Sequence, residues 1–331
     1  MPPPATRLWP SLPAARHTPH PRVPFQVAHL GQVFTIGSIP AAEQAWLLAT
    51  SAGWAASATI QTAATVLSPT ASGALCLNLA APERQAWFTH IGLALRQSGR
   101  IRAWRDEPYA LFALPGHPPV DFGASAETSA ANAQPPLLAH IERATARFWG
   151  SLTFGAHANG YVADAAGRPV QVWVARRSLT KPTDPGMLDN LVGGGVPLGQ
   201  TPSQALLREA WEEAGLLPHQ LQAVQRGSAL HIEADIREGR QLEWLYVFDV
   251  PLPAGLTPVN QDGEVAGLEC LPVAEALAHA AAGRMTTDAS LAMLDFGLRH
   301  QLLAADAPEA TALRALAVPA PQAAWFDPAW G

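Results

Sequence analysis

The sequence predicts a mixed α/β (α+β) protein, in which a smaller α+β domain precedes a larger domain built on a mixed sheet. The chain has 331 residues, and a prior of roughly 150 residues per domain predicts about two domains. Apolar residues make up 48% of the chain and charged residues 15%, which is enough for two sizeable cores. Strand and helix patterns follow one another without regular alternation, and this favours a mixed sheet.

The composition argues against several classes of partner. The net charge is −6, and no basic cluster has interleaved aromatic residues, so we expect neither nucleic-acid nor membrane binding. No apolar stretch reaches the roughly 18–20 residues of a membrane span. Cys76 and Cys270 lack metal-type spacing, which is typical of free thiols in a reducing compartment, and we expect a cytoplasmic protein. The sequence leaves open whether it is a monomer or a homodimer.

The first part of the chain is expected to hold the smaller domain. Residues 1–22 are predicted to be a flexible N-terminus, because many prolines oppose an amphipathic helix and no apolar signal-peptide core follows. Residues 23–136 should form the N-terminal domain and a linker. The patterns predict, in order, strand structure over 23–37, helices over 41–53 and 81–99, interrupted strand segments over 101–114, and a Pro/Gly/Ser/Ala-rich linker over 115–136.

Residues 137–303 are expected to form the second domain. Its patterns predict a short helix over 137–150, hairpins joining 160–165 to 169–177 and 229–236 to 241–250, a strand over 264–272, and helices over 201–215, 273–284 and 290–303. The tail, 304–331, is rich in alanine and proline. It should be either disordered or docked through Trp325 and Trp330.

The helix over 201–215 has strong start and stop signals. Thr201 can cap it, Pro202 occupies its first position, and Gln204 completes a capping box with Thr201. Gly215 supplies a left-handed stop. Within LREAWEEAGL (207–216), Glu209, Glu212 and Glu213 stand at i, i+3 and i+4, so they share one face of this helix.

Three neighbouring carboxylates need compensation. Adjacent glutamates repel by roughly 1 kcal/mol per pair in water, and by more where solvent is partly excluded. One explanation is a solvated acidic face. The other is a divalent cation, since Mg²⁺ and Mn²⁺ prefer carboxylate oxygen and leave positions for water and phosphate. Gly193, Gly194 and Gly195 precede the helix and favour the second explanation, because glycines let a bare backbone approach a ligand.

The whole stretch resembles the motif of a known superfamily. From Gly194 to Leu216 it runs G-x5-Q-x7-R-E-A-W-E-E-A-G-L. This is similar to the Nudix box of the Nudix hydrolases, G-x5-E-x7-R-E-U-x-E-E-x-G-U, where U is usually aliphatic. Gln200 stands where the family has glutamate, and Ala210 is a small residue at a U position. The resemblance implies an α/β/α sandwich with a mixed sheet, and hydrolysis of a diphosphate that depends on Mg²⁺ or Mn²⁺.

The resemblance also implies roles for the residues of the motif. Glu209, Glu212 and Glu213 fall on metal-binding positions, and the carbonyl of Gly193 falls on a backbone-ligand position. Arg208 and Gln200 fall on the pair that braces the loop against the helix. Since Gln200 is neutral, its bond to Arg208 loses one ionic partner.

The general base is left open between two glutamates. Many members of the superfamily have a further downstream glutamate, and Glu264 in NQDGEV (260–265) is the candidate here, as metal ligand or as base. A plain turn carboxylate is the alternative for Glu264. Glu212 is the other candidate base, and one of the two carboxylates must take the proton of the attacking water.

A closer resemblance concerns the segments around the motif. Residues 140–150, 154–162, 185–195 and 294–300 look like parts of the Nudix region associated with thiamine pyrophosphokinase, a subgroup with an extra N-terminal domain. This implies hydrolysis of a thiamine-like diphosphate, such as oxo- or oxy-thiamine diphosphate, to the monophosphate. Such an enzyme would clear damaged cofactor, which is a form of metabolite repair.

Other polar residues are candidates for substrate contact. His157 and Asn159 alternate with small residues, so they are expected on one side of a strand, either near substrate or in structural hydrogen bonds. Asp189 and Asn190 either shape the glycine loop or approach substrate. Arg176, with its neighbours Arg177 and Lys181, either holds phosphate or lies on a solvated surface.

Two other functions fit the same motif. A non-catalytic Nudix-fold module that binds or senses a ligand is the main alternative, and Gln200 is the residue that supports it. An isopentenyl diphosphate isomerase on this fold would need an active-site cysteine. Cys76 lies in the first domain and Cys270 follows Glu264 within a strand, so neither is well placed.

Overall fold

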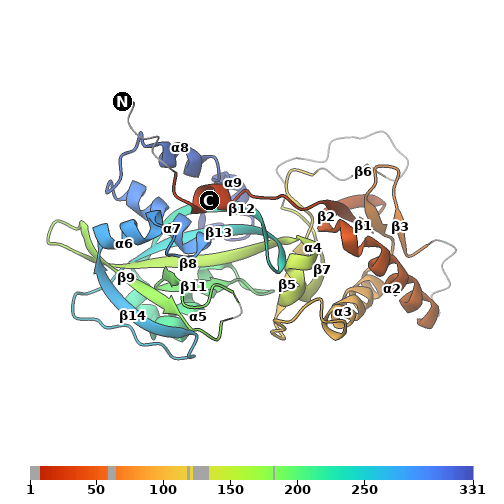
Figure 1. Cartoon of the computed structure of the whole chain (residues 1–331), viewed down its shortest axis with the longest axis horizontal. Helices are drawn as coiled ribbons and strands as arrows, with labels where there is room; N and C mark the ends of the chain where they lie inside the picture. The colour runs from red at the N-terminus through yellow and green to blue at the C-terminus, as the bar shows by residue number, and fades with distance from the viewer. Residues whose placement is uncertain (1–7, 59–64, 118–119, 122–133, 182, 331) are drawn as a thin grey trace.

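The computed structural model describes residues 8–58, 65–117, 120–121, 134–181 and 183–330, which form two lobes (Figure 1). The first lobe contains a five-stranded sheet in the order β3-β4-β1-β2-β6 and a separate two-stranded sheet, β5-β7. Its elements are β1 (Arg22–His29), β2 (Gln32–Pro40), η1 (Ala41–Glu43), α2 (Gln44–Ser57), β3 (Leu67–Pro69), β4 (Leu75–Leu77), α3 (Ala81–Gln97), β5 (Pro108–Phe112), β6 (Val120–Asp121), β7 (Leu137–Glu142), η2 (Arg143–Thr145) and α4 (Ala146–Trp149).

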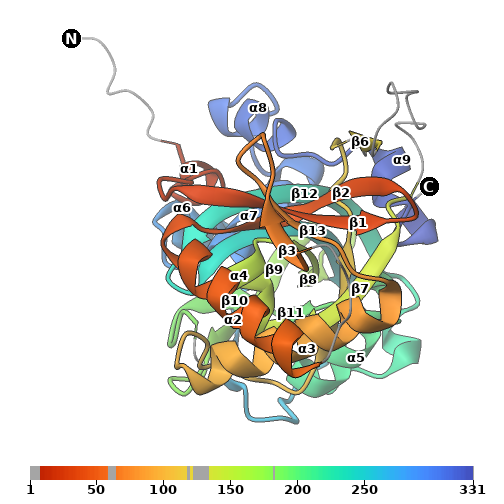
Figure 2. The ribbon, with the colours of Figure 1, turned by 90° about the vertical axis from the view of Figure 1, so that its right-hand side faces the viewer.

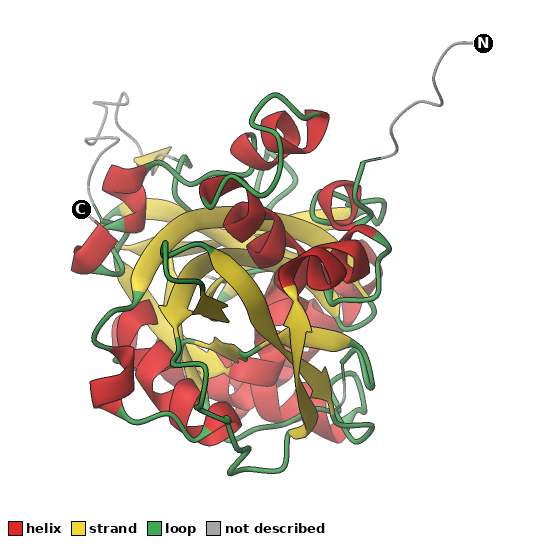
Figure 3. Ribbon diagram, turned by 90° about the vertical axis from the view of Figure 1, so that its left-hand side faces the viewer, coloured by secondary structure: helices red, strands yellow, loops and turns green. Residues whose placement is uncertain are grey.

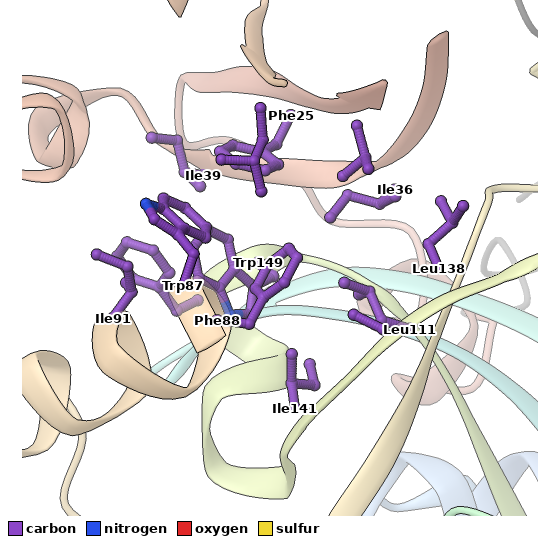
Figure 4. Close-up of a cluster of buried hydrophobic side chains, with 14 of the residues drawn as sticks. Phe25, Ile36, Ile39, Trp87, Phe88, Ile91, Leu111, Leu138, Ile141 and Trp149 are labelled. Carbon is purple, nitrogen blue, oxygen red and sulfur yellow. The ribbon is translucent and has the colours of Figure 1, made fainter. Parts of the chain in front are cut away.

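Aromatic rings fill the core of the first lobe (Figure 4). The ring centroid of Trp149 lies 5.1 Å from that of Phe25 and 5.3 Å from that of Phe88. Trp87 and Trp149 are fully buried, and rings of this size contribute much of the apolar area that a small core buries.

The boundary between the lobes lies later than predicted. Leu138 and Ile141 of β7 and Trp149 of α4 pack in the first core, so residues 137–149 belong to the first lobe and not to the second. The predicted helix over 137–150 is also wrong in its first half, because β7 pairs antiparallel with β5. Of the predicted linker 115–136, residues 118–119 and 122–133 lie outside the described residues.

The second lobe is a mixed sheet between helices, as predicted (Figure 3). The strand order is β10-β9-β8-β13-β12, with β11 paired to β8 and β14 to β9; β8 and β13 are parallel. Its elements are β8 (Leu152–Ala163), β9 (Pro169–Arg177), β10 (Leu188–Asn190), β11 (Val192–Gly195), α5 (Pro202–Ala214), η3 (Pro218–Leu221), β12 (Gln225–Ile236), β13 (Gly239–Pro251), β14 (Val265–Pro272), α6 (Val273–Ala281) and α7 (Thr287–Arg299).

Alternation along the central strands builds two cores. Leu245 and Val247 of β13 pack with α6 and α7, while Trp244 and Tyr246 pack with α5 on the opposite face. The sheet therefore separates α5 from the other two helices. Both predicted hairpins, β8–β9 and β12–β13, are present.

The N-terminal segment is a structured part of the second lobe. It contains helix α1 (Ser11–Ala14), and Trp9, Leu12 and Ala15 are buried in the core beside α7. The backbone N–H of Glu233 donates to the carbonyl of Ala15 at 2.9 Å. The chain then crosses to the first lobe (Figure 1), which faces the viewer in Figure 2. The prediction of a flexible lead-in is therefore wrong for residues 8–22, because apolar side chains dock there.

The C-terminal tail is also docked. It forms α8 (Pro308–Arg314), α9 (Ala320–Ala323) and η4 (Pro328–Trp330). The ring centroid of Phe326 lies 4.3 Å from that of Phe154, and Trp330 lies 4.8 Å from Tyr246. Docking through aromatic residues is confirmed, and the alternative of disorder is wrong for the described part of the tail. Among the described helices, none is long and apolar enough to cross a membrane.

Candidate functional site

Helix α5 has the ends that its sequence predicts. The hydroxyl of Thr201 accepts from the N–H of Gln204 at 3.2 Å, and the side chain of Gln204 accepts from the N–H of Thr201 at 2.9 Å. Gly215 ends the helix with φ 64°, a left-handed conformation that favours glycine. Leu206 and Ala210 are buried against the sheet. This packing fixes the glutamate face of α5 next to the glycine loop, residues 193–195.

Arg208 connects two of the glutamates to that loop. Its guanidinium donates to Glu209 Oε1 and to Glu212 Oε2, each at 2.8 Å, and to the carbonyl of Gly195 at 3.3 Å. Its Nε lies 3.5 Å from Gln200 Oε1, at the outer limit of a hydrogen bond. The loop and the helix are thus joined by Arg208, but the predicted contribution of Gln200 is weak.

Glu209 and Glu213 are buried, with 8% and 6% of their surface exposed. Burial raises the pKa of Glu209, and burial together with the charge of Glu209 raises the pKa of Glu213 well above its usual value. Glu213 Oε2 accepts the backbone N–H of Gly193 at 2.8 Å. An ionised Glu213 is costly here without a cation close to it.

Lys181 supplies positive charge on the other side of the site. Its ammonium pairs with Glu264 and lies 3.9 Å from Glu213 Oε1. Arg105 of the first lobe donates to Glu264 at 3.4 Å. Burial acts to raise the pKa of Glu264, but the hydrogen bond and charge of Lys181 outweigh it, so this pKa is lowered. Lys181 is 11% exposed in its side chain, so it does not lie on a solvated surface.

The donor atoms suit a hard divalent cation by type, because the motif supplies carboxylate oxygens beside an exposed backbone loop. In the described part of the chain, however, no three His, Cys, Asp or Glu side chains are grouped to hold a metal ion. The carboxylates of Glu209 and Glu212 point to Arg208, and that of Glu264 to Lys181. A cation bound by these residues would replace contacts that Arg208 and Lys181 now make.

Each glycine of the loop has a reason to lack a side chain. A Cβ on Gly193 would lie 2.8 Å from the ring of His157, and one on Gly194 would lie 2.0 Å from the carboxyl of Glu209. A Cβ on Gly195 would lie 1.7 Å from the hydroxyl of Tyr109. The triplet therefore lets a strand, a helix and the first lobe approach one short stretch of backbone.

Gly194→Ala is expected to lower activity more than stability. The added methyl group displaces Glu209, whose flexible side chain can turn away from the loop without unfolding the helix. Misplacing a group of an active site by about 1 Å costs on the order of 10²-fold in rate, and Glu209 is a predicted metal ligand. Parallel measurement of kcat and of the thermal unfolding midpoint tests this, with Gly267→Ala as control, since a Cβ there meets nothing within 4 Å. Equal activity of the two variants would contradict the expectation.

A polar cavity of about 210 Å³ lies beside the loop, between the two lobes. Of the predicted substrate-binding residues, His157 and Asp189 line it. Arg176 does not, since it is on the far side of the strand, where its side chain is 47% exposed near Glu269. The other lining residues include Arg105, Tyr109, Arg143, Arg147, Thr153, Arg177, Gly193, Gly194, Gly195, Glu243, Thr286 and Asp288.

The two predicted asparagines are buried and are not among the residues that line the cavity. Asn159 is fully buried, donates to Asp249 at 3.2 Å, and accepts from Asn190 at 2.8 Å. Asn190 Oδ1 in turn accepts a hydrogen bond from His157 Nδ1 at 2.9 Å. The prediction that Asn159 and Asn190 touch substrate is therefore replaced by supporting positions, in which Asn190 bonds His157 directly and Asn159 bonds Asn190.

Several residues in and next to the cavity lie outside the motif and were not predicted from the sequence. Arg147 pairs with the buried Glu243 at 2.9 Å, and Gln241 donates to Asp288 at 3.1 Å. Burial, together with the charge of Glu243, raises the pKa of Asp288 to about 6. These residues come from both lobes and meet only through the fold, so spacing along the chain gives no sign of them.

Comparisons with known proteins agree with the motif. Residues 153–289 match the family model described as the NUDIX domain. Nudix hydrolase 20, chloroplastic, of Arabidopsis thaliana is 36% identical over 167 residues, 50% of this chain and 44% of that protein. An uncharacterized protein of Saccharomyces cerevisiae is 31% identical over 212 residues, 60% of this chain and 56% of that protein. The chain thus spans about half the length of the curated relatives it matches.

A solved structure is similar as well. The crystal structure of DR0079 from Deinococcus radiodurans is 25% identical, covers 49% of this chain and 93% of its own, and has a TM-score of 0.37. The matched residues, 153–289, lie in the second lobe; they agree with the resemblance of the motif, and the predicted fold class is confirmed. The closer resemblance to a thiamine-associated subgroup stays a prediction.

Proposed function

We propose that the chain is a metal-dependent hydrolase that cleaves a P–O–P bond in a small-molecule diphosphate. The observation that carries this is the glutamate face of α5, held against the glycine loop inside the matched Nudix domain. Buried carboxylates with raised pKa values are unfavourable for folding alone. Their placement together at one loop favours a functional role.

The proposed site residues have two roles, as metal ligands and as the general base. Glu209, Glu212, Glu213, Glu264 and the carbonyl of Gly193 would hold Mg²⁺ or Mn²⁺. When bound, such cations neutralise diphosphate charge and lower the pKa of water.

Either Glu212 or Glu264 would take the proton of the attacking water. Their side chains are 37% and 39% exposed, so both are reachable by solvent. Arg208 would position the acidic face.

The proposed substrate is a thiamine-like diphosphate, including its oxo- and oxy- damaged forms, which would leave as the monophosphate. The cavity beside the loop offers both signs of charge, with Arg105 and Arg143 contributed by the first lobe and Glu243 and Asp288 by the second. A ligand with an anionic diphosphate and a cationic or amino-bearing ring matches such a lining. The proposal includes a cytoplasmic location and a role in metabolite repair.

A substrate panel tests the proposal. The purified 331-residue protein is incubated with thiamine, oxythiamine, adenosine and simple alkyl diphosphates, each with Mg²⁺, Mn²⁺ or EDTA. We expect metal-dependent release of inorganic phosphate together with the monoester, and higher kcat/KM for thiamine-type substrates. If no diphosphate is cleaved at any metal concentration, the chain is not this enzyme.

A binding module without turnover is the second candidate. It is favoured by one observation: Arg208 and Lys181 already neutralise the glutamates from within the protein. Calorimetry on the same panel separates the two functions. Tight binding of a diphosphate with no product after prolonged incubation supports the module, and turnover excludes it.

A further inference from the structure

The first lobe makes direct contact with the glycine loop. Tyr109 of β5 is 5% exposed, and its hydroxyl occupies the space where a side chain of Gly195 would begin. Next to it, the backbone N–H of Leu198 donates to the carbonyl of Pro108 at 2.8 Å. One strand of the first lobe thus contacts the loop by packing and by a backbone hydrogen bond.

Tyr109 is itself held in place by a charged pair. The guanidinium of Arg143 lies 5.5 Å from the centroid of the Tyr109 ring and donates to Glu107 at 2.8 Å. Such a cation over a ring is attractive, and more so where water is excluded. Tyr109 also pairs across strands with Ile141 of β7, whose side chain is buried in the first core. The tyrosine therefore has little freedom to move away from the loop.

Within the second lobe, β11 pairs with β8 and the N–H of Gly193 donates to Glu213, but the side-chain brace from α5 to the segment that follows Gly195 is weak. The bond that should brace it, from Arg208 to Gln200, is 3.5 Å long and has a neutral acceptor. A charged acceptor makes such a bond shorter and stronger. Arg208 also divides its donors between Glu209, Glu212 and the carbonyl of Gly195.

We infer that the first lobe is part of the hydrolytic unit, with Tyr109 as a positioning residue that fixes the glycine loop against α5. The expected effect on rate rests on the proposed function. The claim that Tyr109 holds the loop in place does not depend on that function. Tyr109 touches the backbone of the loop and not the reacting atoms. Its loss should therefore lower kcat more than it raises KM.

Amide hydrogen exchange tests whether Tyr109 holds the loop in place, without any substrate. Tyr109→Ala is expected to speed exchange at the amides of residues 193–198 by at least about tenfold, while amides within α5 stay protected. Leu138→Ala is the matched control, because it opens the same first core without touching the loop. Unchanged exchange in Tyr109→Ala, or equal effects of the two variants, would overturn the inference. These exchange rates can be measured even if the protein hydrolyses no diphosphate.

A double-mutant cycle tests the link to rate. No positive φ restricts Gly195, so what opposes an alanine there is mainly the tyrosine. Gly195→Ala should lower kcat about 10²-fold in the native background, yet less than about threefold when Tyr109→Ala has made room. The same fold-loss of kcat in both backgrounds would overturn the coupling.

Gln200→Glu, which restores a charged partner for Arg208, should recover part of the kcat lost in Tyr109→Ala. No recovery would count against the proposed bracing.

Discussion

Glu213→Gln is expected to abolish metal-dependent hydrolysis, with kcat falling by at least about 100-fold, because stabilisation of transition-state charge by one site group is worth about 10²–10³ in rate. Glutamine has nearly the same shape, and its carbonyl oxygen can still accept the N–H of Gly193, which Glu213 accepts at 2.8 Å. The substitution therefore removes charge and leaves the loop contact. The measurement is kcat at saturating Mg²⁺ on the best substrate of the panel.

The same substitution should leave the fold as stable or make it more stable. The pKa of Glu213 is raised in the folded state, chiefly by burial and then by the charge of Glu209. The folded protein therefore binds this proton more tightly than the unfolded chain, and ionisation of Glu213 lowers stability as pH rises above its unfolded value near 4.3. Removing the group removes this loss, so the thermal midpoint at neutral pH should not fall.

Glu275→Gln is the matched control for Glu213→Gln. It makes the same chemical change on α6, where Glu275 is exposed and its only described ion pair is a 3.8 Å contact with His279. Both activity and unfolding midpoint should stay at the native values. The proposal for Glu213 fails if its variant keeps more than about a tenth of the native kcat, a loss smaller than that of one transition-state contact.

Sequence reasoning succeeded where the determinants are local. The ends of α5 depend on Thr201, Gln204 and Gly215, all within one segment, and capping rules describe them fully. The glutamate face follows from helical spacing alone. Local patterns also located both hairpins of the second lobe.

Reasoning from the sequence failed where contacts join distant residues. Tyr109, Arg143 and Glu243 meet at the loop across more than one lobe, and nothing in their spacing predicts this. For the same reason residues 8–22 looked flexible, although Trp9 and Leu12 lie in the core formed with α7. Low charge and many prolines predict a segment with little regular secondary structure. Such a segment can still pack its apolar side chains against the rest of the protein.

These long-range contacts change which truncations are informative. Removing residues 1–135 would take Trp9, Leu12 and Ala15 from the second core. It would also leave β7 and α4 without the sheet they pack on, since Leu138 and Trp149 lie in the first core. A test of the first lobe by deletion would therefore confuse folding with function, and point substitutions at the contact, such as Tyr109→Ala, are the better probe.

Asp249 is the buried carboxylate to which Asn159 donates, and its hydrogen bonds suggest the largest effect on stability. It is fully buried on β13. Arg299 donates to its two oxygens at 2.6 and 3.0 Å, and His300 Nε2 lies 2.8 Å from Oδ2. Asn159 is a further donor, so the carboxylate joins α7 to the asparagines that support His157. Burial acts to raise the pKa of Asp249, but the bonds from His300 and Arg299 outweigh it and lower this pKa.

Asp249→Ala should cost about 3–5 kcal/mol of unfolding free energy, because Arg299 keeps only Asp295 as a described carboxylate partner, and the buried Asn159 and the partly buried His300 lose an acceptor. Urea unfolding measures this, with Glu269→Ala as control, since the 3.9 Å pair of Glu269 with Arg176 is exposed and such pairs contribute about 0–1 kcal/mol. The pH dependence gives an independent check. A lowered folded pKa means that the contribution of Asp249 is complete above the unfolded value near 3.9 and is lost as pH falls through the folded one. The difference in unfolding free energy between the native protein and Asp249→Ala should therefore be constant from about pH 5 to 7 and become smaller below about pH 4. If this difference stays constant in acid, packing accounts for the loss of stability and the charge of Asp249 does not.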